Sequence, residues 1–274
     1  MRTLKLADGA AVPLVGQGTW HMGENPAERK SEVAALRLGI ELGMTLIDTA
    51  EMYGEGGAEE VVGEAVRSDR DRVFLVSKVY PHNASRKGVP EACERSLRRL
   101  GTDHIDLYLL HWRGQYSLGE TVEAFERLKE QGKILRWGVS NLDLDDMQEL
   151  AAPMCATNQV LYNPGERGIE FDLLPWCQSQ SMPVMAYCPL GQGGDLLRHP
   201  TLVDIARRYD AQPAQVALAW ALRQPGVLVI PKSINPTHLR ANASAADLNL
   251  SSDDLSKIDE AFPPPVHRRP LQMV

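Results

Sequence analysis

The sequence contains no long hydrophobic segment. No apolar run in its 274 residues approaches the roughly 18 residues of a membrane helix, and its N-terminus lacks the apolar core of a signal peptide. Basic residues are not in excess either, since 36 Asp and Glu outnumber 29 Lys and Arg and the net charge is −7. A mildly acidic chain without a basic run is poorly suited to nucleic acids or membrane surfaces. We therefore expect a cytoplasmic protein that binds a small molecule.

Cysteines are few and widely separated. The four are Cys93, Cys155, Cys177 and Cys188, which show neither a CxxC motif nor the spacing of metal ligands. This pattern predicts reduced, mostly buried thiols and no metal site. Hydrophobic residues make up 43% and charged residues 24% of the chain, ordinary values that allow a sizeable folded core.

Apolar, strand-like runs alternate with amphipathic helical stretches along most of the chain. A hairpin signal around Asp8-Gly9 comes first. Eight strand candidates follow, at residues 14–18, 45–48, 73–77, 105–110, 135–139, 157–160, 183–187 and 227–230. They are continuous apolar runs rather than alternating ones, which indicates a parallel sheet buried on both faces.

Eight such units predict an α/β fold, a (β/α)₈ TIM barrel with an N-terminal β-hairpin. Nothing marks a domain boundary, so residues 1–274 are expected to form a single domain. The intervening helices have clear end signals: Gly43 and Gly101 suit the left-handed position after a helix, and Ser117 has capping-box spacing to Glu120.

Ionisable residues close three consecutive strands. Asp48 ends the second, Lys78 the third and His111 the fourth, at intervals of about one βα unit. In a parallel barrel the carboxyl ends of the strands meet on one face, where functional groups gather. Tyr53 follows Asp48 in the adjoining loop and should reach the same rim.

Each of these residues has a simple structural interpretation. Asp48 could cap a turn, Lys78 could extend to solvent, His111 could be a satisfied core histidine, and Tyr53 could pack on the rim. Taken together they favour a functional site, because a lysine and an aspartate that close apolar strands would each be costly unless they pair.

The cluster suits proton donation to an oxygen atom. An ammonium group beside a tyrosine lowers its pKa from about 10, so Lys78 would make proton exchange by Tyr53 easier while Asp48 orients Lys78. A neutral His111 could donate a hydrogen bond to a carbonyl oxygen and orient the substrate. No serine or cysteine nucleophile is evident, so we expect the other reactant to be a hydride donor.

The motifs GQGTW, LIDTAEMYG, FLVSKV, LYLLHW, WGVSN, TNQVLY, MAYCPLG and VIPKS occur in the order and spacing of the aldo-keto reductases. This resemblance covers essentially the whole chain. Residues 42–66 together with FLVSKVYPHNA look especially like bacterial aldo-keto reductases that reduce methylglyoxal. The resemblance implies NADPH-dependent reduction of small aldehydes and ketones to alcohols, with Asp48, Tyr53, Lys78 and His111 as the catalytic tetrad and Tyr53 as proton donor.

The same resemblance implies a set of cofactor contacts. Ser140, Asn141 and Gln159 match residues that bind the nicotinamide amide, and Tyr187 matches the aromatic that stacks on the nicotinamide ring. The full implied set of cofactor residues is Gly18, Thr19, Trp20, Asp48, Ser140, Asn141, Gln159, Tyr187, Cys188, Pro189, Leu190, Gly191, Ile230, Lys232, Ser233, His238 and Asn242.

The segment expected to bind the adenosine end of the cofactor departs from the family pattern. Lys232 and Ser233 match residues that hold the 2′-phosphate of NADP, and an ammonium plus a hydroxyl suits a phosphate. The usual arginine is His238 here, and the usual glutamate is Ala241. Arg240 could compensate from one turn away. We expect NADPH to be preferred, with NADH accepted more weakly.

The substrate is expected to contact Trp20, Tyr53, His111 and Trp112. Met22 and Tyr80 are further candidates for the mouth, as is the C-terminal segment PPPVHRRPLQMV, which resembles the family's variable substrate loop.

Two other functions stay open at this point. One is a Schiff-base aldolase with Lys78 as nucleophile, and the other is a non-enzymatic, cofactor-sensing subunit on the same fold. Neither explains the intact tetrad together with the IPKS segment. We expect a monomer, whereas the physiological carbonyl substrate does not follow from the sequence.

Overall fold

The computed structural model describes residues 1–151 and 153–274 and confirms the predicted barrel. Its eight strands form one parallel sheet in chain order. They are β3 (Gln17–Gly18), β4 (Leu46–Asp48), β5 (Phe74–Val79), β6 (Leu107–Leu110), β7 (Trp137–Ser140), β8 (Asn158–Leu161), β9 (Val184–Tyr187) and β10 (Val227–Val229). A parallel bridge between Val15 and Val229 joins the first strand region to the last and closes the ring.

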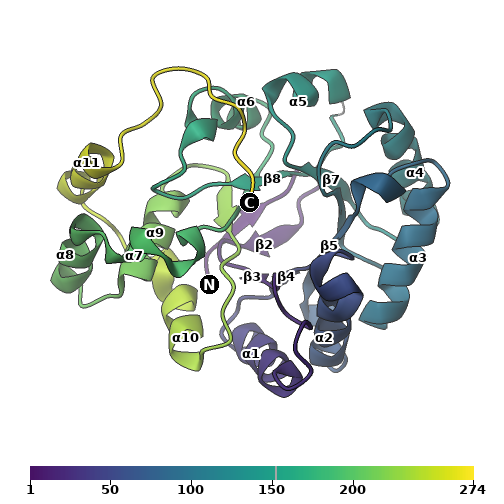
Figure 1. The fold of residues 1–274 in the computed structure, drawn as a ribbon, viewed down its shortest axis with the longest axis horizontal. Coiled ribbons are helices and arrows are strands. Elements are labelled where there is room, and N and C mark those ends of the chain that lie inside the picture. The colour runs from purple at the N-terminus through teal and green to yellow at the C-terminus, as the bar shows by residue number, and fades with distance from the viewer. Residues whose placement is uncertain (152) are drawn as a thin grey trace.

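Helices surround this ring on the outside (Figure 1). They are α1 (Arg29–Glu41), α2 (Gly57–Val66), α3 (Gly88–Leu100), α4 (Leu118–Glu130), α5 (Leu144–Leu150), α6 (Leu173–Ser179), α7 (Asp195–Arg198), α8 (Pro200–Arg208), α9 (Pro213–Leu222), α10 (Pro236–Ser244) and α11 (Ser252–Ala261). Strands β6, β7 and β8 are buried along their whole length, including the polar residues Ser140, Asn158 and Gln159.

The helix ends follow the local sequence signals. Gly43 has φ +90° just after α1, and Gly101 has φ +65° at the C-cap of α3. Both are left-handed conformations that glycine adopts at little cost. Ser117 caps α4, where its side chain accepts a hydrogen bond from the backbone N–H of Glu120. The two glycine predictions and the Ser117 cap are confirmed, whereas the Glu120 side chain accepts from the backbone N–H of Arg86 instead of completing a capping box.

The N-terminal hairpin pairs β1 (Thr3–Lys5) with β2 (Ala11–Pro13) in antiparallel register. Leu6 and Val12 from this hairpin belong to the same apolar cluster as Leu46, Leu107 and Leu109 of the barrel strands. The hairpin therefore closes one end of the barrel interior and leaves the carboxyl ends of the strands for the site.

The C-terminal segment, residues 263–274, follows α11 and returns across the face of the barrel. Figure 1 shows it in yellow, running from α11 past α6 and ending over the centre of the ring. Within the described part of the chain, no helix has both the length and the apolar character needed to cross a membrane.

The hairpin packing gives a stability prediction. Leu6 is 6% exposed within the apolar cluster, so Leu6→Ala should lower the free energy of unfolding by about 2–5 kcal/mol. Leu135, which is 41% exposed, is the matched control, and Leu135→Ala should stay within about 0.5 kcal/mol of wild type. Urea denaturation measures both. Equal losses in the two variants would show that the hairpin does not close the core.

Candidate active site

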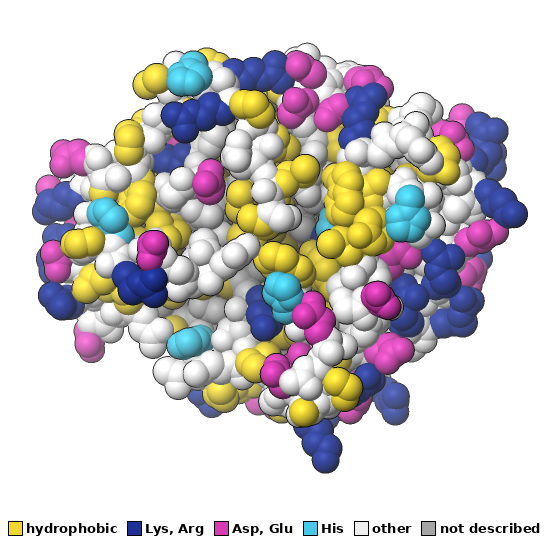
Figure 2. Space-filling view, viewed as in Figure 1, with side chains coloured by type: hydrophobic (Ala, Val, Ile, Leu, Met, Phe, Trp, Pro, Cys, Tyr) yellow, Lys and Arg dark blue, Asp and Glu magenta, His cyan; other side chains and the backbone are white. Residues whose placement is uncertain are grey.

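A cavity of about 890 Å³ opens at the carboxyl ends of the strands. Figure 2 shows the face seen in Figure 1, with hydrophobic side chains gathered around a central depression and most charged side chains toward the periphery. The predicted residues that line the cavity are Gly18, Thr19, Trp20, Asp48, Tyr53, His111, Trp112, Ser140, Asn141, Gln159, Tyr187, Cys188, Pro189, Leu190, Ile230, Lys232, Ser233, His238 and Asn242.

Lys78 lies at the base of the cluster and is completely buried. Its Nζ donates hydrogen bonds to Asp48 Oδ2 at 2.7 Å, to the Thr49 carbonyl oxygen at 2.9 Å and to Tyr53 Oη at 3.3 Å. An ammonium group has three protons, and here each has an acceptor. The Tyr53 oxygen acts as an acceptor in this arrangement, so the phenolic proton is free to be donated elsewhere.

Asp48 is held on both sides. While Oδ2 accepts from Lys78, Oδ1 accepts from Gln159 Nε2 at 2.7 Å. Burial raises the pKa of Asp48 and lowers the pKa of Lys78, and the charge of each partner opposes the shift of the other. The pair therefore depends on its own attraction and on these hydrogen bonds to remain ionised inside the barrel.

Tyr53 behaves differently from the sequence prediction. The expected lowering of its pKa by Lys78 is wrong in this structure: burial raises the pKa of Tyr53 well above its ordinary value, and the negative charge of Asp48 raises it further. The positive charge of Lys78 is balanced by the neighbouring carboxylate of Asp48, so Lys78 does not lower the pKa of Tyr53. Tyr53 is consequently protonated at neutral pH.

Tyr53 lies at the start of an unusual turn. Tyr53 begins a short 3₁₀ segment, and Gly54, Glu55 and Gly56 that follow all have positive φ. A side-chain carbon at Gly54 would approach the Met22 carbonyl oxygen to 3.0 Å, so the turn has little space for a larger residue. Helix α2 starts directly after it and fixes the turn against the barrel.

His111 lies beside Tyr53, with the two rings perpendicular and their centroids 5.7 Å apart. Burial lowers the pKa of His111 well below its ordinary value, and the positive charge of Lys78 lowers it further. The imidazole is therefore neutral at neutral pH. Its buried Nδ1 has no hydrogen-bond partner among the described residues.

The residues expected to bind nicotinamide form one connected group. Tyr187 Oη donates to Asn141 Oδ1 at 2.9 Å, and Asn141 Nδ2 lies 3.2 Å from the His111 carbonyl oxygen and from Ser140 Oγ. Ser140 Oγ donates in turn to the Gln159 carbonyl oxygen at 2.9 Å. The carboxyl ends of β7, β8 and β9 thus share one set of hydrogen bonds.

The cavity lining also includes Lys232 and Ser233, in the loop between β10 and α10, and His238, in the first turn of α10. Asn242 lies deeper, is 2% exposed, and its Oδ1 has no hydrogen-bond partner among the described residues. A buried carbonyl oxygen without a donor is an acceptor available to a ligand. Arg240 is exposed and outside the cavity lining, so its side chain does not compensate in this conformation.

The mouth differs in part from the prediction. Trp20 and Trp112 line the cavity, and so do Met273 and Val274 of the C-terminal segment. Met22 is completely buried instead, and Tyr80 packs edge-on against Trp112, with ring centroids 5.2 Å apart, outside the lining.

Gly191 is likewise not among the described lining residues, although Gln192 and Gly193 are. Several lining residues were not predicted. They are His21, Met52, Gln192, Gly193, Leu197, Gln212, Pro213, Ala214 and Pro231, of which Met52 and Pro231 lie within the motifs LIDTAEMYG and VIPKS. His21, which stacks on Trp20 with ring centroids 4.3 Å apart, could have been inferred from its neighbour in the sequence.

The cavity also concentrates left-handed backbone. His21, Asn141, Cys188 and Gln192 have φ between +45° and +65° without being glycine, and all four line the cavity. Such conformations cost free energy and persist where the surrounding structure enforces them, most often at functional sites. The loops after the strands therefore adopt backbone conformations of higher energy where they form the cavity.

The family model of the aldo/keto reductase family matches residues 14–262. The chain therefore belongs to the aldo/keto reductase family, which confirms the resemblance of its motifs.

Individual relatives are similar over the full length. The chain is 55% identical to the methylglyoxal reductase YeaE of Escherichia coli (strain K12), over 100% of this chain and 99% of that protein. It is 37% identical to a glyoxal reductase of Bacillus subtilis (strain 168), over 94% of this chain and 91% of that protein. An aldo-keto reductase from Klebsiella pneumoniae, solved in complex with NADPH, superposes with a TM-score of 0.98 at 56% identity, covering 100% and 99% of the two chains.

The buried pair gives the second prediction. Lys78→Met leaves the Asp48 carboxylate without its cation, so the free energy of unfolding should fall by about 3–5 kcal/mol and reductase activity should be lost. Adding Asp48→Asn removes the unpaired charge and should recover part of the stability but not the activity. Urea denaturation and a reductase assay follow the two quantities.

Lys257→Met is the control, because Lys257 pairs with Asp253 on the surface of α11, where one ion pair contributes about 0–1 kcal/mol. A double variant no more stable than Lys78→Met would contradict the proposed pairing.

Proposed function

We propose that this protein reduces small aldehydes and ketones, among them 2-oxoaldehydes such as methylglyoxal, to alcohols with NADPH. The observation that carries the proposal is the contact of Lys78 Nζ with Asp48, Thr49 and Tyr53 below a cavity that Tyr53 and His111 line. This arrangement keeps a protonated tyrosine at the cavity floor with its oxygen already hydrogen-bonded from behind.

The residues present fit a dinucleotide that carries a 2′-phosphate. Asn242 Oδ1 is a buried acceptor suited to the amino group of adenine, whereas Lys232 and Ser233 provide a cation and a hydroxyl for phosphate. Tyr187 offers an aromatic face at the other end of the cavity. When bound there, NADPH supplies the hydride for the reduction.

Tyr53 donates the proton in this mechanism. As negative charge develops on the carbonyl oxygen of the substrate, the phenolic proton moves to that oxygen, and the phenolate that forms accepts from Lys78 Nζ. The positive charge of Lys78 thus stabilises the state in which the proton has left. A raised pKa in the resting site ensures that the proton is present when the substrate arrives.

His111 orients the carbonyl group. A neutral imidazole has one N–H donor and one acceptor, and the lowered pKa of His111 keeps it in that form at neutral pH. Trp20, Trp112 and Met273 line the same cavity and provide apolar surface at its mouth. Such a mouth favours small neutral carbonyl compounds, and the similarity to a methylglyoxal reductase supports 2-oxoaldehydes.

The two alternative functions are less well supported. A Schiff-base aldolase needs a lysine amine that reaches its substrate, but Lys78 is completely buried and engaged with three acceptors. A cofactor-sensing subunit would not require the ordered contacts between Lys78, Asp48 and Tyr53.

Replacing the proton donor gives the third prediction. Tyr53→Phe should lower turnover of methylglyoxal by at least about 10²- to 10⁴-fold, the usual effect of general-acid catalysis, with NADPH still bound. Tyr116→Phe, which changes a tyrosine outside the cavity lining, should keep wild-type turnover. Loss of NADPH absorbance measures the rate, and fluorescence quenching measures cofactor binding. Near-normal turnover by Tyr53→Phe would refute the assignment.

The fourth prediction concerns cofactor choice. Lys232→Met should weaken NADPH binding by about 1.5–3 kcal/mol, the range for a hydrogen bond to a charged group, and leave NADH binding nearly unchanged. His238→Arg should tighten NADPH binding, because the permanently charged guanidinium group would add a second cation for the 2′-phosphate. Fluorescence titration with both cofactors checks these values.

His238→Ala tests whether the histidine contributes to this choice. If the His238 side chain contacts the 2′-phosphate, the variant should weaken NADPH binding and leave NADH binding nearly unchanged. Equal binding constants in this variant and in the wild type would mean that His238 does not contact the 2′-phosphate and that Lys232 acts without it.

A further inference from the structure

The C-terminal segment, residues 263–274, enters the cavity although no regular secondary structure holds it there. Met273 and Val274 line the cavity that Tyr53 and His111 also line. The contacts that hold this segment in place therefore determine part of the cavity wall.

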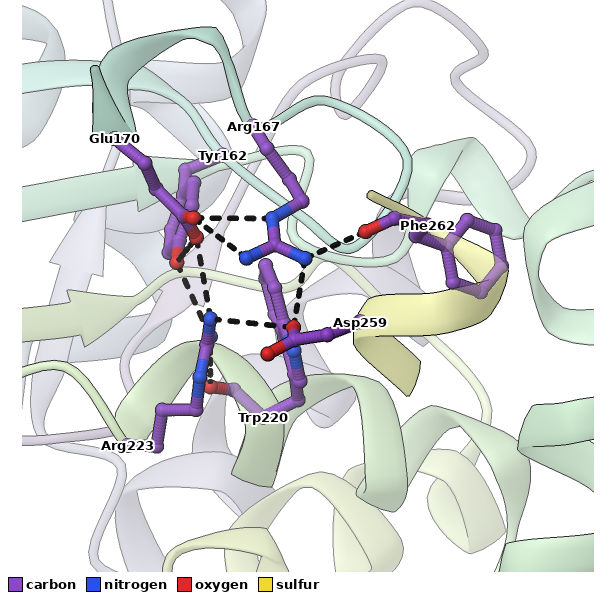
Figure 3. Close-up of polar contacts among 7 residues, drawn as sticks. All are labelled: Tyr162, Arg167, Glu170, Trp220, Arg223, Asp259 and Phe262. Carbon is purple, nitrogen blue, oxygen red and sulfur yellow. Dashed lines mark hydrogen bonds and ion pairs between the residues drawn. The ribbon is translucent and has the colours of Figure 1, made fainter. Parts of the chain in front are cut away.

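The first attachment lies where the segment leaves α11 (Figure 3). Arg167, in the loop after β8, donates from one terminal nitrogen to Asp259 Oδ1 at 2.7 Å and to the Phe262 carbonyl oxygen at 2.5 Å. Phe262 is the C-cap of α11, so Arg167 satisfies a carbonyl group at the helix end. Arg167 is 7% exposed, whereas the side chain of Asp259 is 42% exposed, so the shielded part of this attachment is the arginine.

Arg167 is itself rigidly placed. Its other nitrogens donate to Glu170 Oε2 at 3.0 and 2.6 Å, and its guanidinium lies 5.0 Å from the centre of the Trp220 ring. Arg223 stacks on the same ring at 3.8 Å and contacts Glu170 Oε1 at 3.2 Å. Figure 3 shows the two guanidinium groups and Glu170 gathered around Trp220. The group joins the loop after β8 to α9 and α11.

The second attachment lies within the segment. Arg268 contacts Asp145 Oδ2 at 2.9 Å, Asp172 Oδ2 at 3.1 Å and Asp143 Oδ2 at 3.6 Å. Asp143 and Asp172 are the N-caps of α5 and α6, so the carboxylates are placed by the loops that follow β7 and β8. One guanidinium group thus bridges two helices of the barrel rim.

We propose that Arg167 and Arg268 are positioning residues that hold residues 263–274 over the cavity and thereby determine which carbonyl compounds bind well. This inference rests on the proposed reductase function. The two attachments differ in kind: Arg167 acts from a buried group, whereas Arg268 and its partners are between 22% and 70% exposed and are weakened by salt. The exposed attachment should therefore release first.

Size separates the substrates in the test. If the proposal holds, methylglyoxal should contact only the residues around Tyr53 and His111, whereas the longer 4-nitrobenzaldehyde should reach Met273 and Val274. If the segment is no longer held, the long substrate must order it on binding, which raises KM and leaves kcat almost unchanged. A variant that merely loosens the fold would change the melting temperature without separating the two substrates.

The variants are Arg268→Gln for the exposed attachment and Asp259→Asn for the buried one. Each should raise KM for 4-nitrobenzaldehyde by about 3- to 10-fold, with KM for methylglyoxal and kcat for both within about 2-fold. Arg269→Gln, at the next position, and Asp253→Asn, on the same helix as Asp259, are matched controls that should give wild-type constants. Equal changes for the two aldehydes, or the same constants in variant and control, would overturn the proposal.

A readout without turnover separates this proposal from the proposed function. Chymotrypsin cleavage after Leu271, followed by the mass of the intact protein, should be at least about threefold faster in Arg268→Gln than in Arg269→Gln, because a released segment is cut more easily. Equal cleavage rates would show that Arg268 does not hold the segment. Absence of turnover in every variant would instead contradict the reductase function, and the cleavage rates would still decide how the segment is attached.

Discussion

The contact between Lys78 and Asp48 is the interaction on which the candidate site depends. Both groups are buried, so neither charge would persist without the other. The pair fixes the Lys78 nitrogen below Tyr53, and Gln159 fixes the far oxygen of Asp48. Residues of β4, β5 and β8 are thereby joined at the cavity floor, although β6 and β7 lie between β5 and β8 in the sheet. The C-terminal segment, residues 263–274, is held in part by the exposed ion pairs of Arg268, which are weaker than the buried pair.

The position of these residues at the cavity floor can be predicted from the sequence, because the signals lie within short segments of the chain. Three consecutive apolar runs end at or just before an ionisable residue, and a parallel barrel brings those ends to one face, so Asp48, Lys78 and His111 could be placed together without knowing any contact. Strand bounds were less certain: the run at 14–18 contributes only Gln17–Gly18 to the ladder, and that at 135–139 starts at Trp137. A strand begins where a neighbour pairs with it, which a single run does not encode.

Other features needed the folded chain. The hydrogen bond from Gln159 to Asp48 joins residues 111 positions apart, and the cavity wall at Gln212 starts a helix with no local mark of a site. The direction of the Tyr53 pKa shift also escaped prediction, because it depends on how far the hydroxyl is buried and on a cation that is already paired. The residue types indicate which groups can carry charge, whereas the structure is needed to show how burial and pairing shift their pKa values.

The place where the barrel closes lies inside the cavity. Gly18 at the start of the ring and Pro231 at its end share a backbone hydrogen bond of 3.1 Å, and a side chain at Gly18 would come within 2.8 Å of the Ile230 carbonyl oxygen. Both edges of this seam line the cavity, so a ligand that fills it touches the first and last strands at once. Such a ligand would bridge the first and last strands of the ring, and the stability of the folded barrel would increase with the logarithm of the ligand concentration above its dissociation constant.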